Sequence, residues 1–289
     1  MRAKRASQPA SSPAQSELAG IEQMALSLAN LAGAEIMTAL GGMHAVRYKT
    51  LAKQEHAWRD PVSEIDEHVE TMIRAKLAEA YPDHEVIGEE VAGAAGPHAD
   101  FIWAVDPIDG TANFVNGFPL FAASIGVLHN GEPVAGAVWC STSHKLRSGV
   151  YHARRGGPLS FESEPFKPRR NPAVRRSLAG VPAAVSGLFP WESRKTGSAA
   201  IECALAAAGV LRVARFERPN LWDVAGGIPL VLAAGGSVHT KTKEGWRRMD
   251  RFEGPSQDDI GDFDLRVWRQ PLIVGDPKAV AEYCALDEA

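Results

Sequence analysis

The sequence lacks several features that mark whole classes of protein. Its 289 residues include only three cysteines, Cys140, Cys203 and Cys284, which are widely spaced and form no CxxC pair. A disulfide framework and a cysteine-bound zinc site are therefore not indicated, and a reducing cytoplasm is the expected location. No run of about 18 apolar residues occurs, so we expect no membrane partner. The formal net charge of −4 offers no basic footprint for nucleic acid.

The N-terminal segment, residues 1–16, is rich in Ala, Ser, Pro and Gln and has no long apolar stretch of the kind found in secretion signals. This composition predicts a disordered tail, with a transit peptide as the weaker alternative. The rest of the chain is ordinary in composition, since 45% of all residues are hydrophobic and 23% are charged. Its length allows one large globular domain or two smaller ones.

The spacing of apolar residues predicts a mixed succession of helices and strands. Helical spacing marks residues 17–40 and a second segment that begins at Pro61 and ends before Tyr81. A hairpin is expected at His129-Asn130-Gly131. Pro229 falls inside a later expected helix, where a proline costs about 3 kcal/mol unless the helix is kinked. The other expected elements are strands at 85–87, 101–105, 121–128, 133–140, 149–153, 211–216, 238–240 and 272–274, and helices at 198–208 and 223–234.

The most informative motif is Asp106-Pro107-Ile108-Asp109-Gly110-Thr111, which follows the apolar run Phe101–Val105. Two carboxylates are expected at the tip of a strand, where they repel each other unless a cation neutralises them. Their oxygen atoms suit a hard divalent cation. The backbone N–H groups of Gly110, Thr111 and Ala112 suit a phosphate group if they begin a helix. The motif therefore indicates metal-assisted phosphate chemistry.

Two common phosphate or metal motifs do not fit this segment. An EF-hand loop that begins at Asp106 would place Ile108 at position three and Gly117 at position twelve, where oxygen ligands are required. No GxxxxGK[ST] nucleotide loop occurs anywhere in the chain. Other acidic residues stand at the expected ends of elements, although each has an ordinary structural explanation as a helix cap, a solvated turn or a first-turn residue. They are Asp60, Glu89, Glu90 and Asp223.

The motif and its surroundings resemble the inositol monophosphatase family, over most of the chain from about residue 17. The signature run covers residues 103–114, and a second match is Leu221-Trp222-Asp223-Val224-Ala225-Gly226. Each match alone is moderately specific, and the two together are highly specific. Three further matches and a distant glycine pair occur in the expected order, at residues 60–66, 87–90, 197–200 and 234–236.

The resemblance implies a fold and an activity. The fold class is α+β or α/β, a layered α-β-α-β-α sandwich of the sugar-phosphatase type. We expect an N-terminal α+β half, residues 17–153, to carry the metal and phosphate site. A C-terminal α/β half, residues 154–289, would complete it. The implied activity is that of a Mg²⁺-dependent, lithium-sensitive phosphomonoesterase, and the implied assembly is a homodimer.

The resemblance also assigns roles to individual residues. It implies one Mg²⁺ ion at Glu89, Asp106 and the carbonyl of Ile108, and a second at Asp106, Asp109 and Asp223. A third, weaker ion is implied near Glu89 and Glu90. Asp60 and Thr111 would orient and help to deprotonate the attacking water, and Glu90 is placed with these catalytic residues. The implied substrate contacts are Asp109, Gly110, Thr111, Ala112, Gly197, Ser198, Ala199 and Glu217.

Departures from the family pattern leave the substrate open. Residues 157–195 contain a Pro/Arg-rich segment and residues 241–264 are charged and long, and both fall on the expected substrate side. Inositol 1-phosphate or a similar polyol or sugar phosphate is the favoured substrate. Histidinol phosphate and fructose 1,6-bisphosphate are alternatives, as is 3'-phosphoadenosine phosphate, against which Ala112-Asn113 argues. A catalytically silent protein that binds metal or anions is the alternative of another class.

Overall fold

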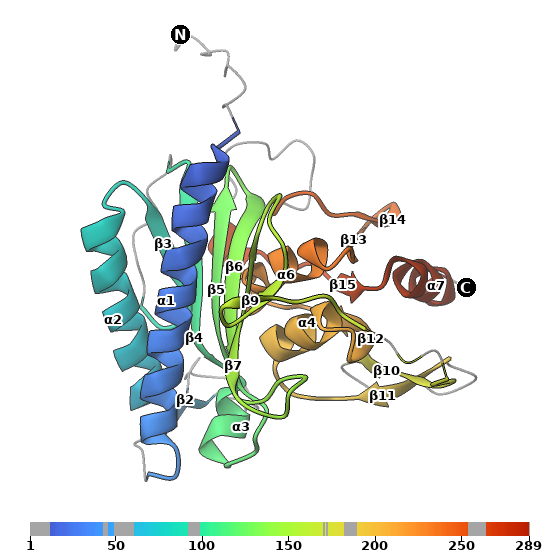
Figure 1. Ribbon diagram of the computed structural model, residues 1–289, viewed down its shortest axis with the longest axis horizontal. Helices are drawn as coiled ribbons and strands as arrows, with labels where there is room; N and C mark the ends of the chain where they lie inside the picture. The colour runs from blue at the N-terminus through green and yellow to red at the C-terminus, as the bar shows by residue number, and fades with distance from the viewer. Residues whose placement is uncertain are drawn as a thin grey trace, which may run out of the picture.

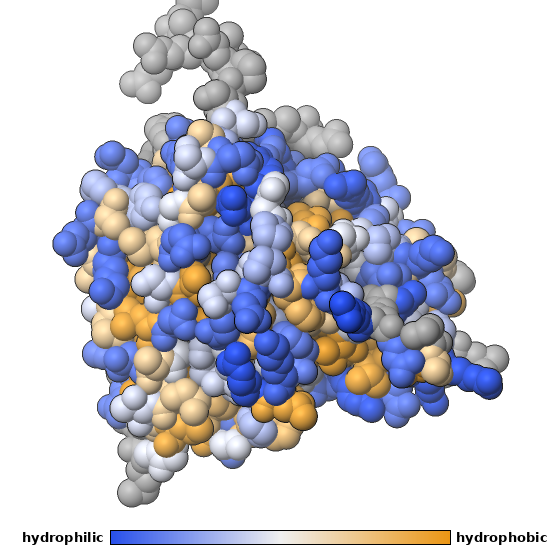
Figure 2. Space-filling model, viewed as in Figure 1, coloured by the Kyte–Doolittle hydropathy of each residue, from blue (hydrophilic) through white to orange (hydrophobic). Residues whose placement is uncertain are grey.

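The computed structural model describes residues 12–42, 64–91, 99–169, 171, 173–181, 190–253 and 264–288, together with the backbone of 46–48 and 61–63. Two sheets dominate it, and helices cover or separate them (Figure 1). No helix in these ranges combines the length and apolar character needed to cross a membrane. Polar residues cover most of the face shown in Figure 2, with smaller apolar areas between them.

The first sheet has seven strands in the order β3-β4-β5-β6-β7-β8-β9, and only the pair β3–β4 is parallel. Helices α1 and α2 pack on one of its faces and α5 and α6 on the other. The central strands are therefore buried along almost their whole length. The bounds are α1 Gln15–Ala39, α2 Glu64–Ala80, β3 Glu85–Gly88, β4 Phe101–Asp109, β5 Ala122–His129, β6 Glu132–Cys140, β7 Gly149–Arg154, β8 Ser160–Phe161 and β9 Glu164–Pro165, with α5 Leu221–Ala225 and α6 Gly227–Ala233.

The second sheet has six strands in the order β11-β10-β12-β15-β13-β14. Helix α4 packs against β12 on one face, and α7 packs on the other, where the buried side chains of Trp191, Val213, Ile273 and Tyr283 meet. The remaining bounds are β10 Ser177–Gly180, β11 Trp191–Arg194, α4 Ala199–Ala207, β12 Leu211–Phe216, β13 Ser237–Thr242, β14 Gly245–Arg248, η2 Leu265–Val267, β15 Leu272–Gly275 and α7 Pro277–Asp287.

These elements form five layers, namely α1 and α2, the first sheet, α4 to α6, the second sheet, and α7 (Figure 1). The layered α-β-α-β-α fold predicted from the sequence is confirmed. The strands of the first sheet extend to Pro165, and those of the second begin at Ser177. The division into halves at residue 153 stays a prediction.

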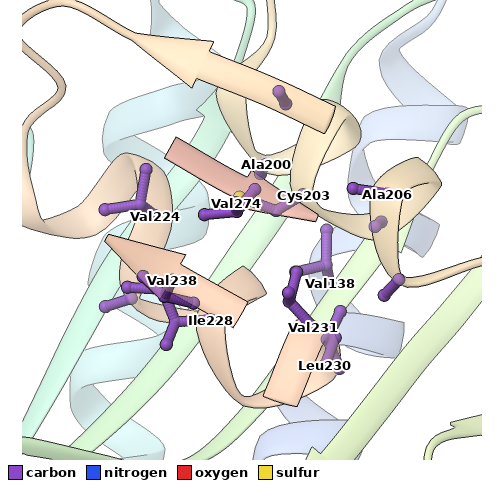
Figure 3. Packing of buried hydrophobic residues seen from close by; sticks show 14 of the residues in the cluster. Val138, Ala200, Cys203, Ala206, Val224, Ile228, Leu230, Val231, Val238 and Val274 are labelled. Carbon is purple, nitrogen blue, oxygen red and sulfur yellow. The ribbon is translucent and has the colours of Figure 1, made fainter. Parts of the chain in front are cut away.

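The middle helical layer supplies the largest hydrophobic core. Val138 of β6 faces Val231 of α6, and Val238 and Val274 of the second sheet lie on the other side of the layer (Figure 3). Two glycines permit this close packing. A Cβ atom on Gly136 of β6 would lie 2.1 Å from the carbonyl oxygen of Gly226, which joins α5 to α6.

Several sequence-based boundaries needed correction. The strand expected at 101–105 continues to Asp109, so the two acids lie within the strand rather than beyond it. The helix expected at 223–234 is two short helices, α5 and α6, that meet at Gly226. Pro229 is the third residue of α6, in the first turn, where a missing N–H costs little.

The start of the second helix was also predicted wrongly. Pro61 belongs to β2 (Pro61–Ser63), which pairs with β1 (Val46–Tyr48), and α2 begins only at Glu64. The first helix begins at Gln15, two residues before the expected start and inside the predicted tail. Residues 1–11 lie outside the described part of the chain.

A buried ionic group joins α1 to the edge of the first sheet. Glu22 accepts a hydrogen bond of 2.7 Å from His152 Nδ1 and another of 2.7 Å from Arg154 Nη1. The other ring nitrogen of His152 lies 2.7 Å from the carbonyl oxygen of Glu162. Because both ring nitrogens face acceptors, the arrangement favours the protonated imidazole, which donates from both nitrogens.

The buried pairing of His152 with Glu22 should make the stability of the protein depend on pH. Burial lowers the pKa of His152, but its hydrogen bonds to Glu22 and Glu162 outweigh this and raise it overall. The stabilisation should be complete below the unfolded-state pKa of about 6.5 and should be lost as the pH rises through the raised pKa. In urea unfolding, we expect His152→Gln to lose more stability near pH 6 than near pH 9. His68→Gln, at a side chain that is 56% exposed, is the control, and an equal loss at both pH values would contradict the prediction.

Candidate active site

The central motif lies where β4 departs from regular pairing. Asp106 is opposite Ser124 of β5 and Asp109 is opposite Ala122, and the register shifts between the two acids. Asp106 is 1% exposed and Asp109 is 8% exposed. Gly110 then adopts a left-handed conformation with φ of 88° and begins the five-residue helix α3 (Thr111–Val115). This conformation favours glycine because the residue has no Cβ.

Asp109 joins the first sheet to the start of α4. Its Oδ2 accepts hydrogen bonds from Ser198 Oγ at 2.5 Å and from the backbone N–H of Ala200 at 2.6 Å. The side chain of Asn113 donates to the carbonyl oxygen of Thr196 at 2.8 Å. The structure therefore brings the expected substrate-side turn, residues 197–199, next to the metal motif.

Asp223 reaches the same place from α5. Its carboxylate accepts a hydrogen bond of 2.7 Å from the backbone N–H of Asn220 and contacts of 3.1 Å from the Asn220 side chain. Ser124 of β5 donates to the carbonyl oxygen of Trp222 at 3.0 Å, which fixes α5 on the sheet. Asp223 is thus held beside β4, although it lies more than a hundred residues later in the chain.

The electrostatics of the site show how closely the acids gather. Burial raises the pKa of Asp106 well above its usual range, and the charges of Glu89, Asp109, Asp223 and Asp66 raise it further. Burial also raises the pKa of Asp109 and that of Asp223, and Glu89 adds to both shifts. Five carboxyl groups therefore repel one another in a largely buried position, which favours a cation among them.

The carboxylate oxygens of the cluster suit a divalent metal ion, although the side chains are not arranged around a common point. In the described ranges, no three His, Cys, Asp or Glu side chains form a group that could already hold a metal ion. Asp109 and Asp223 instead accept bonds from nearby N–H and hydroxyl groups. Asp106 Oδ1 is buried and accepts no hydrogen bond from the described residues. Such an unsatisfied oxygen among other carboxylates is what a hard cation requires.

The structure adds a residue that sequence reasoning left without a role. The hydroxyl of Thr111 lies 3.1 Å from Oδ1 of Asp66 and 2.8 Å from the carbonyl oxygen of Ile108, both of which can accept its proton. Asp66 lies in the first turn of α2 and is 1% exposed. Asp60, which was expected in this position, lies outside the described residues. The available signal was spacing, because Asp66 shares the buried stripe of α2 with Val69.

The turn after β3 is held by a second buried acid that the sequence analysis missed. Glu70 is fully buried and accepts hydrogen bonds from the backbone N–H of Glu90 at 2.7 Å and of Val91 at 3.1 Å. Arg74 neutralises it at 2.7 Å. Glu70 therefore fixes the backbone that carries Glu89 and Glu90, the first of which acts electrostatically on Asp106.

The structure does not bring Glu217 into this cluster by any contact among the described residues. Its exposed carboxylate pairs with Nη1 of Arg215, which also pairs with Asp287 of α7. Glu217 thus follows Arg215 toward the α7 face of the second sheet. The expected contact with a polyol ring has no support from this placement.

Known proteins resemble this chain over most of its length. The family model for the inositol monophosphatase family matches residues 17–260. The fructose-1,6-bisphosphatase/inositol-1-monophosphatase of Aquifex aeolicus is 30% identical over 268 residues, which cover 86% of this chain and 95% of that protein. The probable inositol 1-monophosphatase ImpA of Mycobacterium tuberculosis is 32% identical over 234 residues, covering 75% and 84%.

A solved structure extends the similarity to the fold. The extragenic suppressor protein suhB from Bartonella henselae superposes with a TM-score of 0.69 at 25% identity, and the match covers 92% of this chain and 97% of that chain. The family model spans most of the chain and includes the acids of the cluster, Asp66, Glu89, Asp106, Asp109 and Asp223. The chain therefore belongs to the inositol monophosphatase family and is a phosphatase, a hydrolase of phosphoric monoesters.

Proposed function

We propose that this phosphatase acts on a small polyol or sugar phosphate, with inositol 1-phosphate as the reference substrate, and that it depends on Mg²⁺. The observation that carries the proposal is the buried, unsatisfied Oδ1 of Asp106 among four other carboxyl groups. Bound ions would neutralise these acids and the phosphate oxygens. The residues proposed to hold two or three ions are Glu89, Asp106, Asp109, Asp223 and the carbonyl of Ile108, with Glu90 near the third.

We assign the activation of water to Thr111 and Asp66. The Thr111 hydroxyl can donate its proton to Asp66, which leaves a lone pair of the hydroxyl oxygen free to accept a hydrogen bond from water. A water oriented in this way is a better nucleophile toward phosphorus. The pair takes the role that sequence reasoning gave to Thr111 and Asp60.

The phosphate group is proposed to lie between the acids and two backbone turns. Gly110 to Ala112 form one turn, and residues 197–199 form the other, which Ser198 joins to Asp109. Phosphoryl transfer depends mainly on positioning and charge neutralisation, which such a pocket provides. The homodimer, the cytoplasmic location and the two-half division remain predictions from the sequence.

The experiment is a phosphate-release assay with inositol 1-phosphate, fructose 1,6-bisphosphate, histidinol phosphate and 3'-phosphoadenosine phosphate, with and without Mg²⁺. We expect release that requires Mg²⁺. In the same assay, Asp66→Asn should lower kcat by about a hundredfold, the usual contribution of one acid–base group. The comparison variant is Asp60→Asn. A smaller effect of Asp66→Asn than of Asp60→Asn would contradict the role proposed for Asp66 in activating water. Phosphate release that does not require Mg²⁺ would contradict the proposed dependence on the metal.

A further inference from the structure

Two arginines lie on the Asp223 side of the carboxylate cluster. The guanidinium of Arg269 lies 5.4 Å from the ring centre of Trp222, the residue that precedes Asp223. Its Nη1 donates hydrogen bonds to the carbonyl oxygens of Trp268 at 2.7 Å and Arg266 at 3.2 Å. These bonds hold the head group in place, and no described residue accepts a hydrogen bond from its other nitrogen atoms, which can therefore donate to a ligand.

Arg218 lies on the same side of the cluster, in the turn whose Asn220 N–H donates to Asp223. Burial lowers the pKa of Arg269, the charges of Asp223 and Glu89 oppose this shift, and Arg218 adds to it. Arg218 is exposed in the turn between β12 and α5. Since arginine stays charged at neutral pH, the two side chains form a positive edge beside the acids.

Glu217, the acid that the family resemblance implies here, does not offset this edge by any contact among the described residues. Glu217, the expected contact for the hydroxyl groups of a polyol, is exposed and pairs with Arg215. Arg215 in turn pairs with Asp287 at 3.3 Å and lies over the rings of Trp246 and Tyr283. The carboxylate of Glu217 thus points toward Arg215 and the α7 face, and Arg218 is the next exposed side chain of the turn.

We propose that Arg218 and Arg269 form a subsite for a negatively charged group on the leaving alcohol of the substrate. The inference rests on the proposed function, since it concerns the same phosphomonoester site. The preferred substrates carry a carboxylate or a second phosphate besides the phosphate that is cleaved. A guanidinium binds both groups with paired, charge-assisted hydrogen bonds.

The positive charge of the subsite also determines how well other leaving alcohols should be accepted. An alcohol that carries an ammonium group, as in histidinol phosphate, meets two positive charges and is disfavoured. A neutral polyol gains nothing from the arginines. Recognition of a charged group by a charged hydrogen bond typically changes affinity by about tenfold or more, so the preference is measurable.

Matched substrate pairs test the subsite. Glycerol 2-phosphate and 2-phosphoglycerate differ only by a CH₂OH group in place of a carboxylate. Fructose 1-phosphate and fructose 1,6-bisphosphate differ by a second phosphate. O-phosphoethanolamine supplies a positive leaving group. We expect kcat/KM to rise by about tenfold or more in at least one anionic member of the pairs, and the pair that responds identifies the anion.

Variants connect this preference to the two arginines. In Arg218→Gln and Arg269→Gln, the ratio of kcat/KM between the charged and the neutral substrate should fall by about tenfold, mainly through KM. Arg248→Gln, at an exposed arginine of β14, is the matched control and should keep the native ratio.

Each outcome has a distinct meaning. Equal rates for charged and neutral substrates in the native enzyme would overturn the subsite while leaving the phosphatase intact. A variant that slows both members of a pair equally would also overturn it, because the arginines would then act on the transferred phosphate or on the fold. If no substrate releases phosphate in the presence of Mg²⁺, the proposed function itself fails, and the subsite fails with it.

Discussion

Asp106→Asn should abolish phosphatase activity and at the same time make the metal-free protein more resistant to heat. Asp106 is buried, its Oδ1 accepts no hydrogen bond from the described residues, and four other carboxyl groups raise its pKa. Replacing it by an amide removes a buried group whose charged form is costly. Loss of an oxygen that we propose to hold Mg²⁺ should slow turnover by about a thousandfold or more, because metal stabilisation of the transition state is worth several kcal/mol.

Thermal unfolding with and without Mg²⁺ separates the two effects. The native protein should unfold at a higher temperature when Mg²⁺ is added, since a ligand that binds the folded state stabilises it. Asp106→Asn should begin higher and gain little from Mg²⁺. Asp100→Asn is the control, because Asp100 is exposed and immediately precedes the same strand. A variant with native turnover, or with the native response to Mg²⁺, would show that Asp106 holds no metal ion.

Gly136→Ala, which adds a single methyl group, should strongly destabilise the protein. The added Cβ would lie 2.1 Å from the carbonyl oxygen of Gly226, and this neighbour is backbone that cannot move aside by a side-chain rotation. Either β6 or the junction of α5 and α6 must shift. We expect a cost of about 3 kcal/mol or more, measured by urea unfolding, at the upper end of overpacking effects.

The same substitution at Gly20 should change the stability in the opposite direction. Gly20 lies on the exposed side of α1, and its nearest neighbour would be Tyr81 Oη at 3.9 Å from the new Cβ. Gly20→Ala should therefore stabilise the protein by about 0.5–1 kcal/mol through helix propensity. If Gly136→Ala is as mild as Gly20→Ala, the contact between β6 and Gly226 is looser than described.

The sequence was sufficient for the layered fold and for the acids of the central motif. Asp106, Asp109 and Asp223 each lie within or beside an element that local patterns predicted, and the turn at residues 197–199 is held against Asp109 by the bond from Ser198. Their meeting could not follow from periodicity, because it depends on how β4, α4 and α5 pack. The family resemblance supplied that step.

Other features depended on tertiary contacts that local patterns do not encode. The place of Asp66 beside Thr111 is set by how α2 packs on β4, which the sequence reasoning did not derive. The role expected for Asp60, which lies outside the described residues, stays a prediction. The orientation of Glu217 follows from a pairing with Arg215 and α7 that no motif records. Pro229 could have indicated the break at Gly226. A proline is unfavourable inside one long helix, but it is normal in the first turn of a short helix such as α6.

The packing of α5 against β5 has a consequence for protein synthesis. The bond from Ser124 to Trp222 spans 98 residues, and the bond from Ser198 to Asp109 spans 89. A ribosome therefore completes the first sheet well before it delivers the helices that cover its second face. Until then, the apolar face of the first sheet lacks the helices α5 and α6 and is open to aggregation. Contacts between segments so far apart in the sequence also form slowly. Enzymatic activity during translation would consequently appear late, once α5 has emerged and settled on the sheet.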